Sequence, residues 1–182
     1  DEALALYPEY ANALNGKGWA LDELGRYEEA IETLDKAIEL IPETAVIWNN
    51  KGWALNGLKR YDEALPVLEK AIELYPDDSN YWYNKGISLS NLGRKEDAIL
   101  AYEQSINVNP KNSLAWNNKG WVLQGLGRYD EALIAYEKAI DLYDKVIEMD
   151  SNLTNEYISK GESLQSIKEY EKIIDKYPES TE

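Results

Sequence analysis

The sequence contains no cysteine, no histidine and no phenylalanine. Without cysteine there is no disulfide bond and no thiolate zinc site, and without histidine there is no haem–histidine ligation. The same two absences remove every catalytic dyad that is built on Cys or His. Most classes of enzyme are therefore excluded, and no metal or cofactor is expected.

Basic residues and long apolar runs are also scarce. The chain has 19 Lys and Arg against 34 Asp and Glu, which gives a net charge of −15. Nucleic-acid binding depends on neutralising phosphates with Lys and Arg, so a polyanionic partner is not expected. No stretch approaches the roughly 18 consecutive apolar residues of a membrane helix, so no membrane partner is expected either. A chain without cysteine fits a reducing compartment, and the predicted location is cytoplasmic.

What the 182-residue chain does contain is an internal repeat. Four independent markers recur with a common step of 34 residues: Trp48, Trp82 and Trp116; the Lys-Gly pairs that begin at Lys17, Lys51, Lys85 and Lys119; Ala30, Ala64, Ala98 and Ala132; and Pro8, Pro42, Pro76 and Pro110. A period of this length is typical of stacked arrays, in which no unit buries its apolar face alone.

Each unit is predicted to contain two helices. In the second unit, apolar side chains recur at helical spacing over 48–58 and again over 61–74, with a short turn between the runs. Pro76 ends the second helix, and the small residues Gly52 and Ala64 are expected to let the two helices approach closely. The corresponding turns of other units carry a residue that adopts a left-handed backbone at little cost: Gly25, Gly93 and Gly127.

These residues resemble the tetratricopeptide repeat, a helix–turn–helix unit of 34 residues. The resemblance covers nearly the whole chain, because several residue types agree at fixed offsets and the motif W-N-N-K-G-W occurs at both 48–53 and 116–121. It implies an all-α fold: a right-handed superhelical solenoid of antiparallel helix–turn–helix units. The first helices of such a solenoid line a concave groove that usually binds a peptide segment of a partner. We therefore expect a protein-interaction scaffold and not an enzyme.

The period breaks near the C-terminus. Lys160-Gly161 follows Lys119-Gly120 by 41 residues, seven more than one period. Seven residues are about two helical turns, so an inserted heptad around residues 136–143 lengthens a helix without turning its buried face away. The insertion predicts one long helix near 129–149 and short helices near 155–167 and 170–176. An alternative keeps the period unbroken, with a helix over 145–160, but it places three turn-forming residues, Asp150, Ser151 and Asn152, inside that helix.

The repeats divide the chain into parts of one predicted solenoid, 1–182. Residues 1–10 resemble the end of a second helix from an upstream repeat, so the chain is expected to be a fragment of a longer array. The parts that follow are repeat 1 (11–44), repeat 2 (45–78), repeat 3 (79–112), repeat 4 with an extended second helix (113–153) and a shortened last repeat (154–182).

A helical wheel of the first helices separates three faces, and the family resemblance implies that one of them lines the groove. We call this set the predicted groove face: Asn15, Trp19, Asn49, Asn50, Trp53, Asn56, Tyr83, Asn84, Asn91, Asn117, Asn118, Trp121 and Gln124. Carboxamides both donate and accept hydrogen bonds and so suit the backbone of an extended peptide, while exposed Trp anchors its side chains. None of these positions is Lys or Arg, so a clamp for a C-terminal carboxylate is not expected.

Other interpretations of these residues remain open. Near-identical repeats copy their residues together, so the row of Asn is also explained by duplication, or by Asn that bridges neighbouring helices. The wheel places the repeated Lys between stacked units, where its ammonium is expected to reach an acidic neighbour, and it predicts a structural role in the core for Trp48, Trp82 and Trp116. A second hypothesis for function is a homo-oligomer that assembles through uncapped ends bearing Leu4, Leu6, Ile173 and Ile174.

Overall fold

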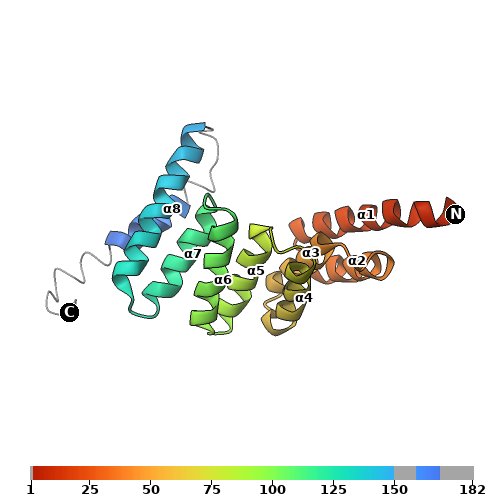
Figure 1. The fold of residues 1–182 in the computed structure, drawn as a ribbon, viewed down its shortest axis with the longest axis horizontal. Helices are drawn as coiled ribbons and strands as arrows, with labels where there is room; N and C mark the ends of the chain where they lie inside the picture. The colour runs from red at the N-terminus through yellow and green to blue at the C-terminus, as the bar shows by residue number, and fades with distance from the viewer. Residues whose placement is uncertain (1, 150–158, 169–182) are drawn as a thin grey trace. The chain divides into compact units, whose positions relative to one another are not determined.

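The computed structural model describes residues 2–149 and 159–168, with side chains over 9–146 and 159–168. In this part of the chain all regular secondary structure is helical, and there is no strand (Figure 1). Its helices are α1 (Glu2–Glu23), α2 (Tyr27–Leu40), α3 (Ala45–Gly57), α4 (Tyr61–Leu74), α5 (Ser79–Asn91), α6 (Lys95–Val108), α7 (Ser113–Gln124) and α8 (Tyr129–Met149). Residues 159–168 form a further helical segment. The predicted all-α fold of helix–turn–helix units is confirmed.

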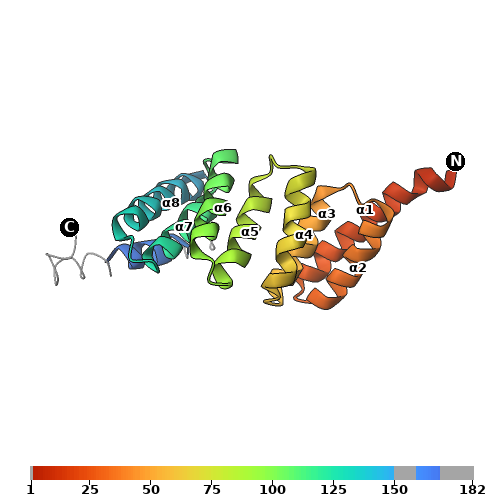
Figure 2. The ribbon, with the colours of Figure 1, turned by 60° about the horizontal axis from the view of Figure 1, so that its bottom comes forward.

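The chain forms two compact units, residues 1–101 and 102–182, and the boundary lies within α6. In the N-terminal unit each helix from α1 to α4 packs on the next, and α3 also contacts α1 and α5 (Figure 2). In the C-terminal unit α7 packs on α8. The first helices α1, α3 and α5 are therefore direct neighbours within one unit. The single solenoid over 1–182 and the repeat boundaries within it stay predictions.

The turns inside the repeats adopt the predicted left-handed backbone. Gly25 has a φ of 71°, and both Gly93 and Gly127 have a φ of 76°. The remaining turn places Lys59 in the same region, with a φ of 60°. A side chain at positive φ is strained. Because Lys59 adopts this conformation in spite of the strain, the repeat retains its turn geometry where another residue replaces glycine.

Small residues bring the paired helices together, as predicted. A Cβ atom added at Gly52 would lie 2.5 Å from Cγ of Leu68 on α4. The same contact joins Gly18 to Leu34 and Gly120 to Tyr136 in the neighbouring repeats. In each pair the two residues are 16 positions apart, so the close contact is a repeated feature of the helix pairs.

The repeated Trp and Pro are joined by hydrogen bonds. The indole Nε1 donates to the carbonyl oxygen of the proline six residues earlier in all three cases: Trp48 to Pro42 (2.7 Å), Trp82 to Pro76 (2.8 Å) and Trp116 to Pro110 (3.2 Å). These bonds tie the start of each first helix to the loop that precedes it. The hydrogen bonds support a structural role for the three Trp, but the predicted position in the core is wrong, because their side chains are half-buried.

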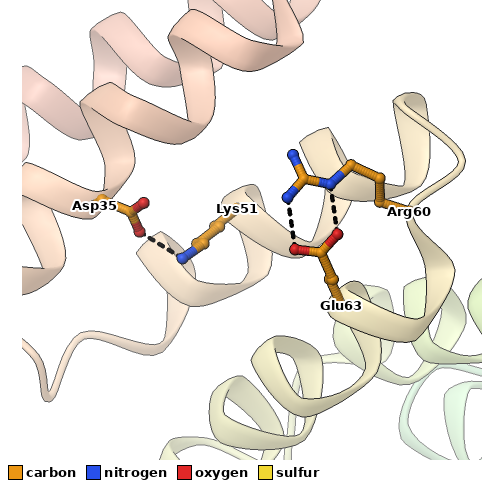
Figure 3. A network of polar contacts seen from close by, with 4 residues as sticks. All are labelled: Asp35, Lys51, Arg60 and Glu63. Atoms are coloured by element: carbon orange, nitrogen blue, oxygen red, sulfur yellow. Dashed lines mark hydrogen bonds and ion pairs between the residues drawn. The ribbon is translucent and has the colours of Figure 1, made fainter.

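The repeated Lys makes the predicted ion pairs between units. Lys51 contacts Asp35 at 2.5 Å (Figure 3), where Asp35 lies on α2 of the preceding repeat. The same pair recurs at a constant spacing of 16 residues as Lys85 with Glu69 (2.8 Å), Lys119 with Glu103 (2.7 Å) and Lys160 with Asp144. Two of these ammonium groups also lie over a Trp ring, that of Lys85 5.9 Å from the Trp82 centroid and that of Lys119 5.7 Å from the Trp116 centroid.

An arginine stands at the start of each second helix and pairs with an acid three residues later. Arg60 donates two hydrogen bonds to Glu63, at 2.7 and 2.5 Å (Figure 3). These bonds lower the pKa of the Glu63 carboxyl. The equivalent pairs are Arg26 with Glu29, Arg94 with Asp97 and Arg128 with Glu131. All lie at the surface, so they help to set the helix start but add little to stability.

Helix α8 has the length that the heptad insertion predicts. It spans Tyr129–Met149, 21 residues, whereas α2 and α4 have 14 each. Its buried side chains continue along one face through Ala132, Tyr136, Ala139 and Tyr143. Residues 150–152, on which the alternative depends, lie outside the described residues, as does the predicted helix over 170–176. Of the predicted helix over 155–167, the described residues begin at 159 and are helical.

One predicted helix boundary is wrong. Helix α1 runs without interruption from Glu2 to Glu23 and includes Pro8, so no helix ends between residues 10 and 11. The fixed φ of proline lies near the helical value, so Pro8 removes one hydrogen bond without forcing the helix to stop. Assignment of 1–10 to an upstream repeat stays a prediction. So does assembly through the ends, because the side chains of Leu4, Leu6, Ile173 and Ile174 lie outside the described part.

The described residues were also searched for membrane and metal features. None of their helices is long and apolar enough to span a membrane. No group of three or more Asp and Glu residues in the same part of the chain is arranged to hold a metal ion.

Candidate functional site

Three tryptophans of the predicted groove face are exposed. Trp19 on α1, Trp53 on α3 and Trp121 on α7 expose 55%, 40% and 61% of their surface. They occupy the same position of their repeats, two residues after the repeated Lys, and Ile87 on α5 takes this position in the third repeat. This position is therefore a repeated site of exposed tryptophan on the first helices.

Carboxamides of the predicted groove face bond to one another across neighbouring helices. Nδ2 of Asn84 on α5 donates to Oδ1 of Asn49 on α3, at 2.8 Å. One repeat earlier, Nδ2 of Asn50 on α3 donates to Oδ1 of Asn15 on α1, at 2.9 Å. Each bond joins residues 35 positions apart, so it links the first helices of consecutive repeats.

A third carboxamide completes this network between α3 and α5. Nδ2 of Asn56 donates to the carbonyl oxygen of Asn84 at 3.1 Å, and Oγ of Ser88 donates to Oδ1 of Asn56 at 2.7 Å. Asn49 and Asn56 are 8% exposed and Asn84 is 4% exposed. The expectation of open carboxamides is therefore corrected for these three residues. Their amide groups are buried between helices, which supports the interpretation that they bridge neighbouring repeats.

The remaining polar residues of the predicted groove face are more accessible. Asn15, Asn50, Tyr83, Asn117, Asn118 and Gln124 are half-buried, and Asn91 is exposed. Nδ2 of Asn91 donates to the carbonyl oxygen of Ile87 at 2.9 Å. Oδ1 of Asn117 accepts from Oγ of Ser163 at 2.6 Å, and Oε1 of Gln124 accepts from the hydroxyl of Tyr136 at 2.8 Å. These side chains are at least partly accessible to solvent.

The N-terminal unit has an open pocket beside Trp53, which we call the N-terminal pocket. It has a volume of about 160 Å³ and is lined by Tyr27, Trp53, Asn56, Gly57 and Ile87. Tyr27 comes from α2 and was not predicted. Its ring covers Gly57, because a Cβ atom at Gly57 would lie 2.6 Å from Cε1 of Tyr27. Repeat 3 has Asn91 at the position of Gly57. The absence of a side chain at Gly57 leaves room for the Tyr27 ring and is the feature of the sequence that could have indicated it.

The C-terminal unit has a larger open pocket beside Trp121, which we call the C-terminal pocket. It has a volume of about 390 Å³ and is lined by Asn117, Asn118, Trp121, Tyr136, Glu162 and Ser166. Two of its residues, Glu162 and Ser166, belong to the helical segment 159–168 that follows the inserted heptad. The sequence predicted Asn117, Asn118 and Trp121 but not the residues that α8 and this segment contribute.

Asp22 on α1 is a buried acid beside the row of Trp. It is 6% exposed, and its Oδ1 has no hydrogen-bond partner within the described residues. Burial raises the pKa of Asp22 above its ordinary value of 3.8, a hydrogen bond from the side chain of Trp53 lowers it, and the charge of Glu23 raises it. Asp22 occupies the repeat position of Asn56, whose Nδ2 has a carbonyl acceptor. Repeat 1 therefore has a carboxylate at the position where repeat 2 has an amide group that donates a hydrogen bond.

Replacing Asp22 by Asn is expected to stabilise the protein by about 1 kcal/mol at pH 7, because it removes a buried charge and supplies a donor. A raised pKa means that folding favours the protonated acid, so its contribution to stability is complete below 3.8 and is lost as pH rises through the folded value. The gain should therefore shrink towards zero below pH 3.8. Urea denaturation of wild type and D22N across this range measures it, with the exposed Glu39→Gln on α2 as control, because Glu39 is not among the groups that shift the pKa of Asp22. An equal gain at every pH would contradict the assignment to the charge of Asp22.

Comparison with known protein families points to one repeat type. Models described as tetratricopeptide repeat match residues 11–43 and 45–78, and a further model of the same description matches residues 83–146. The matches together cover most of the chain and fall on the helix pairs described above. No curated protein matches the chain in sequence.

Solved structures with a similar fold include those of two proteins, MamA and RPAP3. A crystal structure of MamA has a TM-score of 0.71 and 26% identity over 81% of this chain and 86% of that one. MamA from Desulfovibrio magneticus RS-1, residue 41 to the end, has a TM-score of 0.69 and 26% identity over 79% and 85%. The first tetratricopeptide repeat domain of RPAP3 (Spaghetti), bound to the HSP90 peptide SRMEEVD, has a TM-score of 0.64 and 26% identity over 65% and 94%.

Proposed function

Because the chain belongs to the tetratricopeptide repeat family, we propose that it is a non-catalytic scaffold that binds an extended peptide segment of a partner protein. The observation that carries this proposal is the repeated exposure of tryptophan at one position of the first helices, at Trp19, Trp53 and Trp121. Large apolar groups left exposed in a regular pattern mark interaction surfaces, and Trp is enriched among the residues that dominate binding energy.

In this proposal each unit has its own open pocket beside an exposed Trp, and each pocket gives binding at its own unit its specificity. Trp53 lines the N-terminal pocket together with Tyr27 and Ile87, which suits an apolar side chain. Trp121 lines the C-terminal pocket together with Asn117 and Asn118, which adds hydrogen-bonding groups. In this proposal Trp supplies the anchors, and the accessible polar residues contact the backbone of the partner: Asn15, Asn50, Tyr83, Asn91, Asn117, Asn118 and Gln124.

The buried carboxamides have a different part in the proposal. Asn49, Asn56 and Asn84 hold α3 and α5 in register through the bonds described above and so position the surface on which the partner lies. Replacing Asn84 would disturb the helices as well as any binding. The exposed Trp are therefore better probes of binding than the row of Asn.

The chemistry of the partner differs from that of the peptide bound by the similar RPAP3 domain. That peptide, SRMEEVD, ends in acidic residues. The predicted groove face of this chain has no Lys or Arg, and the whole chain carries a net charge of −15. An acidic tail would find no cation on this face, so we propose a partner segment that is neutral or basic.

The proposal is tested by peptide display against the folded chain, with the enriched peptides then measured on variants. Trp53→Ala and Trp121→Ala are each expected to weaken binding by at least about tenfold, because truncating a central aromatic anchor typically costs 2 kcal/mol or more. Leu100→Ala and Ile134→Ala remove comparably exposed apolar side chains from second helices and serve as matched controls. Failure to enrich any peptide, or equal affinity for all four variants, would contradict the proposal.

A further inference from the structure

The C-terminal pocket combines an indole ring with a carboxylate that occupies the same repeat position. Lys119-Gly120 is followed by Trp121, and the corresponding pair Lys160-Gly161 is followed by Glu162. Both side chains line the pocket of about 390 Å³, and both are exposed. Where the repeats would place a second Trp beside Trp121, this chain places an acid.

The charges around this pocket are unbalanced. No Lys or Arg is among its lining residues. Lys119 and Lys160 stand two residues before Trp121 and Glu162, but each already pairs with another acid, Lys119 with Glu103 and Lys160 with Asp144. The carboxylate of Glu162 makes no ion pair within the part of the chain that the structure describes. A negative charge therefore lines an open pocket without a counter-ion from the described residues.

We infer that the C-terminal pocket binds an arginine side chain of the partner peptide. The inference rests on the proposed peptide binding and names the chemistry of one anchor. A guanidinium is planar and weakly hydrated, so it stacks on the face of Trp121 while it donates hydrogen bonds to the carboxylate of Glu162. The polar side chains of Asn117 and Asn118 line the same pocket.

Other side chains fit this pocket less well. An apolar side chain would take water away from Glu162 without replacing its hydrogen bonds, and an acidic side chain would be repelled by it. Lysine carries a compact and strongly hydrated charge, which stacks on Trp less well than a guanidinium does. The net charge of −15 adds a long-range attraction for a cationic segment.

The inference is tested with three capped peptides, acetyl-Gly-X-Gly-amide, in which X is arginine, citrulline or norleucine. Citrulline has nearly the shape of arginine without its charge, and norleucine is apolar. Binding is followed by NMR of the indole NH of Trp121 in the full chain, assigned by its loss in Trp121→Leu. The arginine peptide is expected to bind about fivefold more tightly than the citrulline peptide, consistent with one exposed cation–π contact and one ion pair.

Two variants locate this preference. Glu162→Gln should abolish the advantage of arginine over citrulline, whereas Glu137→Gln, which removes the same charge from an exposed site on α8, should leave it unchanged. Equal binding of the arginine and norleucine peptides, an unchanged preference in Glu162→Gln, or no shift of the Trp121 indole would each overturn the inference.

The outcome is separable from that of the proposed function. If displayed peptides bind and depend on Trp53 and Trp121 but show no preference for arginine, the peptide-binding proposal stands and the arginine pocket is wrong. If the small arginine peptide binds through Glu162 but no longer peptide is enriched, the pocket stands and the extended-segment proposal is wrong.

Discussion

Replacing Gly52 by alanine is expected to lower the free energy of unfolding by about 1–2 kcal/mol. The added Cβ would lie 2.5 Å from both Cγ and Cδ2 of Leu68, and Leu68 is fully buried, so α3 and α4 must move apart or the leucine must leave its rotamer. Overpacking of this kind costs about 1–3 kcal/mol or more, and the better helix propensity of alanine offsets only about 1 kcal/mol of it. Chemical denaturation followed by circular dichroism measures the loss.

Two further variants show whether the contact with Leu68 causes this effect. Gly16→Ala is the matched control, because Gly16 is also inside a helix but has no atom within 4 Å of the added Cβ, so it should gain up to about 1 kcal/mol. Leu68→Ala alone should cost about 2–5 kcal/mol, and Gly52→Ala should add little to it because the new methyl group enters the vacated space. Simple additivity of the two substitutions would refute the packing explanation.

Replacing Asn84 by alanine is expected to cost about 2 kcal/mol of stability. The substitution removes the donor to Oδ1 of Asn49, which is buried and would be left without that hydrogen bond. A buried polar group that loses its partner costs about 1–3 kcal/mol, more than the net value of one hydrogen bond. Because repeat arrays can unfold unit by unit, hydrogen exchange of the amides in α3 and α5 should report the loss directly.

The chain supplies its own control for this prediction. Asn50 makes the same bond to Asn15 one repeat earlier, but the pair is only partly buried. Water can therefore replace the lost partner, and Asn50→Ala should cost less than about 1 kcal/mol. If the two substitutions cost the same, burial of the network between α3 and α5 is not what makes Asn84 important.

Much of the fold was readable from the sequence because its contacts recur within one period. The contact of Gly52 with Leu68 and the ion pair of Lys51 with Asp35 both join residues 16 positions apart. In a stacked array each unit contacts only its neighbours, so a residue that recurs every 34 positions meets the same partner each time. The heptad insertion was readable for the same reason. Asp144 and Lys160 each lie seven residues beyond the position that the 34-residue period gives, and they still pair with each other 16 positions apart.

The candidate site was less predictable. A helical wheel assigns a direction to each side chain, and it placed Trp53 and Asn56 together on one face of α3. It does not say how far the neighbouring helix covers that face. In the structure Trp53 is exposed, while Asn56 lies under α5 and bonds to Asn84. Exposure depends on the distance between α3 and α5, which no single helix encodes.

The sequence by itself determined the repeat, the helix pairs, the left-handed turns and the long helix α8, because each follows from residues that are close in the chain or one period apart. Only the tertiary structure decided which carboxamides are buried and which residues form the pockets. Tyr27 from α2 lines the N-terminal pocket with Trp53, and Glu162 from the segment that follows α8 lines the C-terminal pocket with Trp121. These contacts depend on how successive helices stack, and stacking places side chains of separate repeats on one surface where no local pattern marks them.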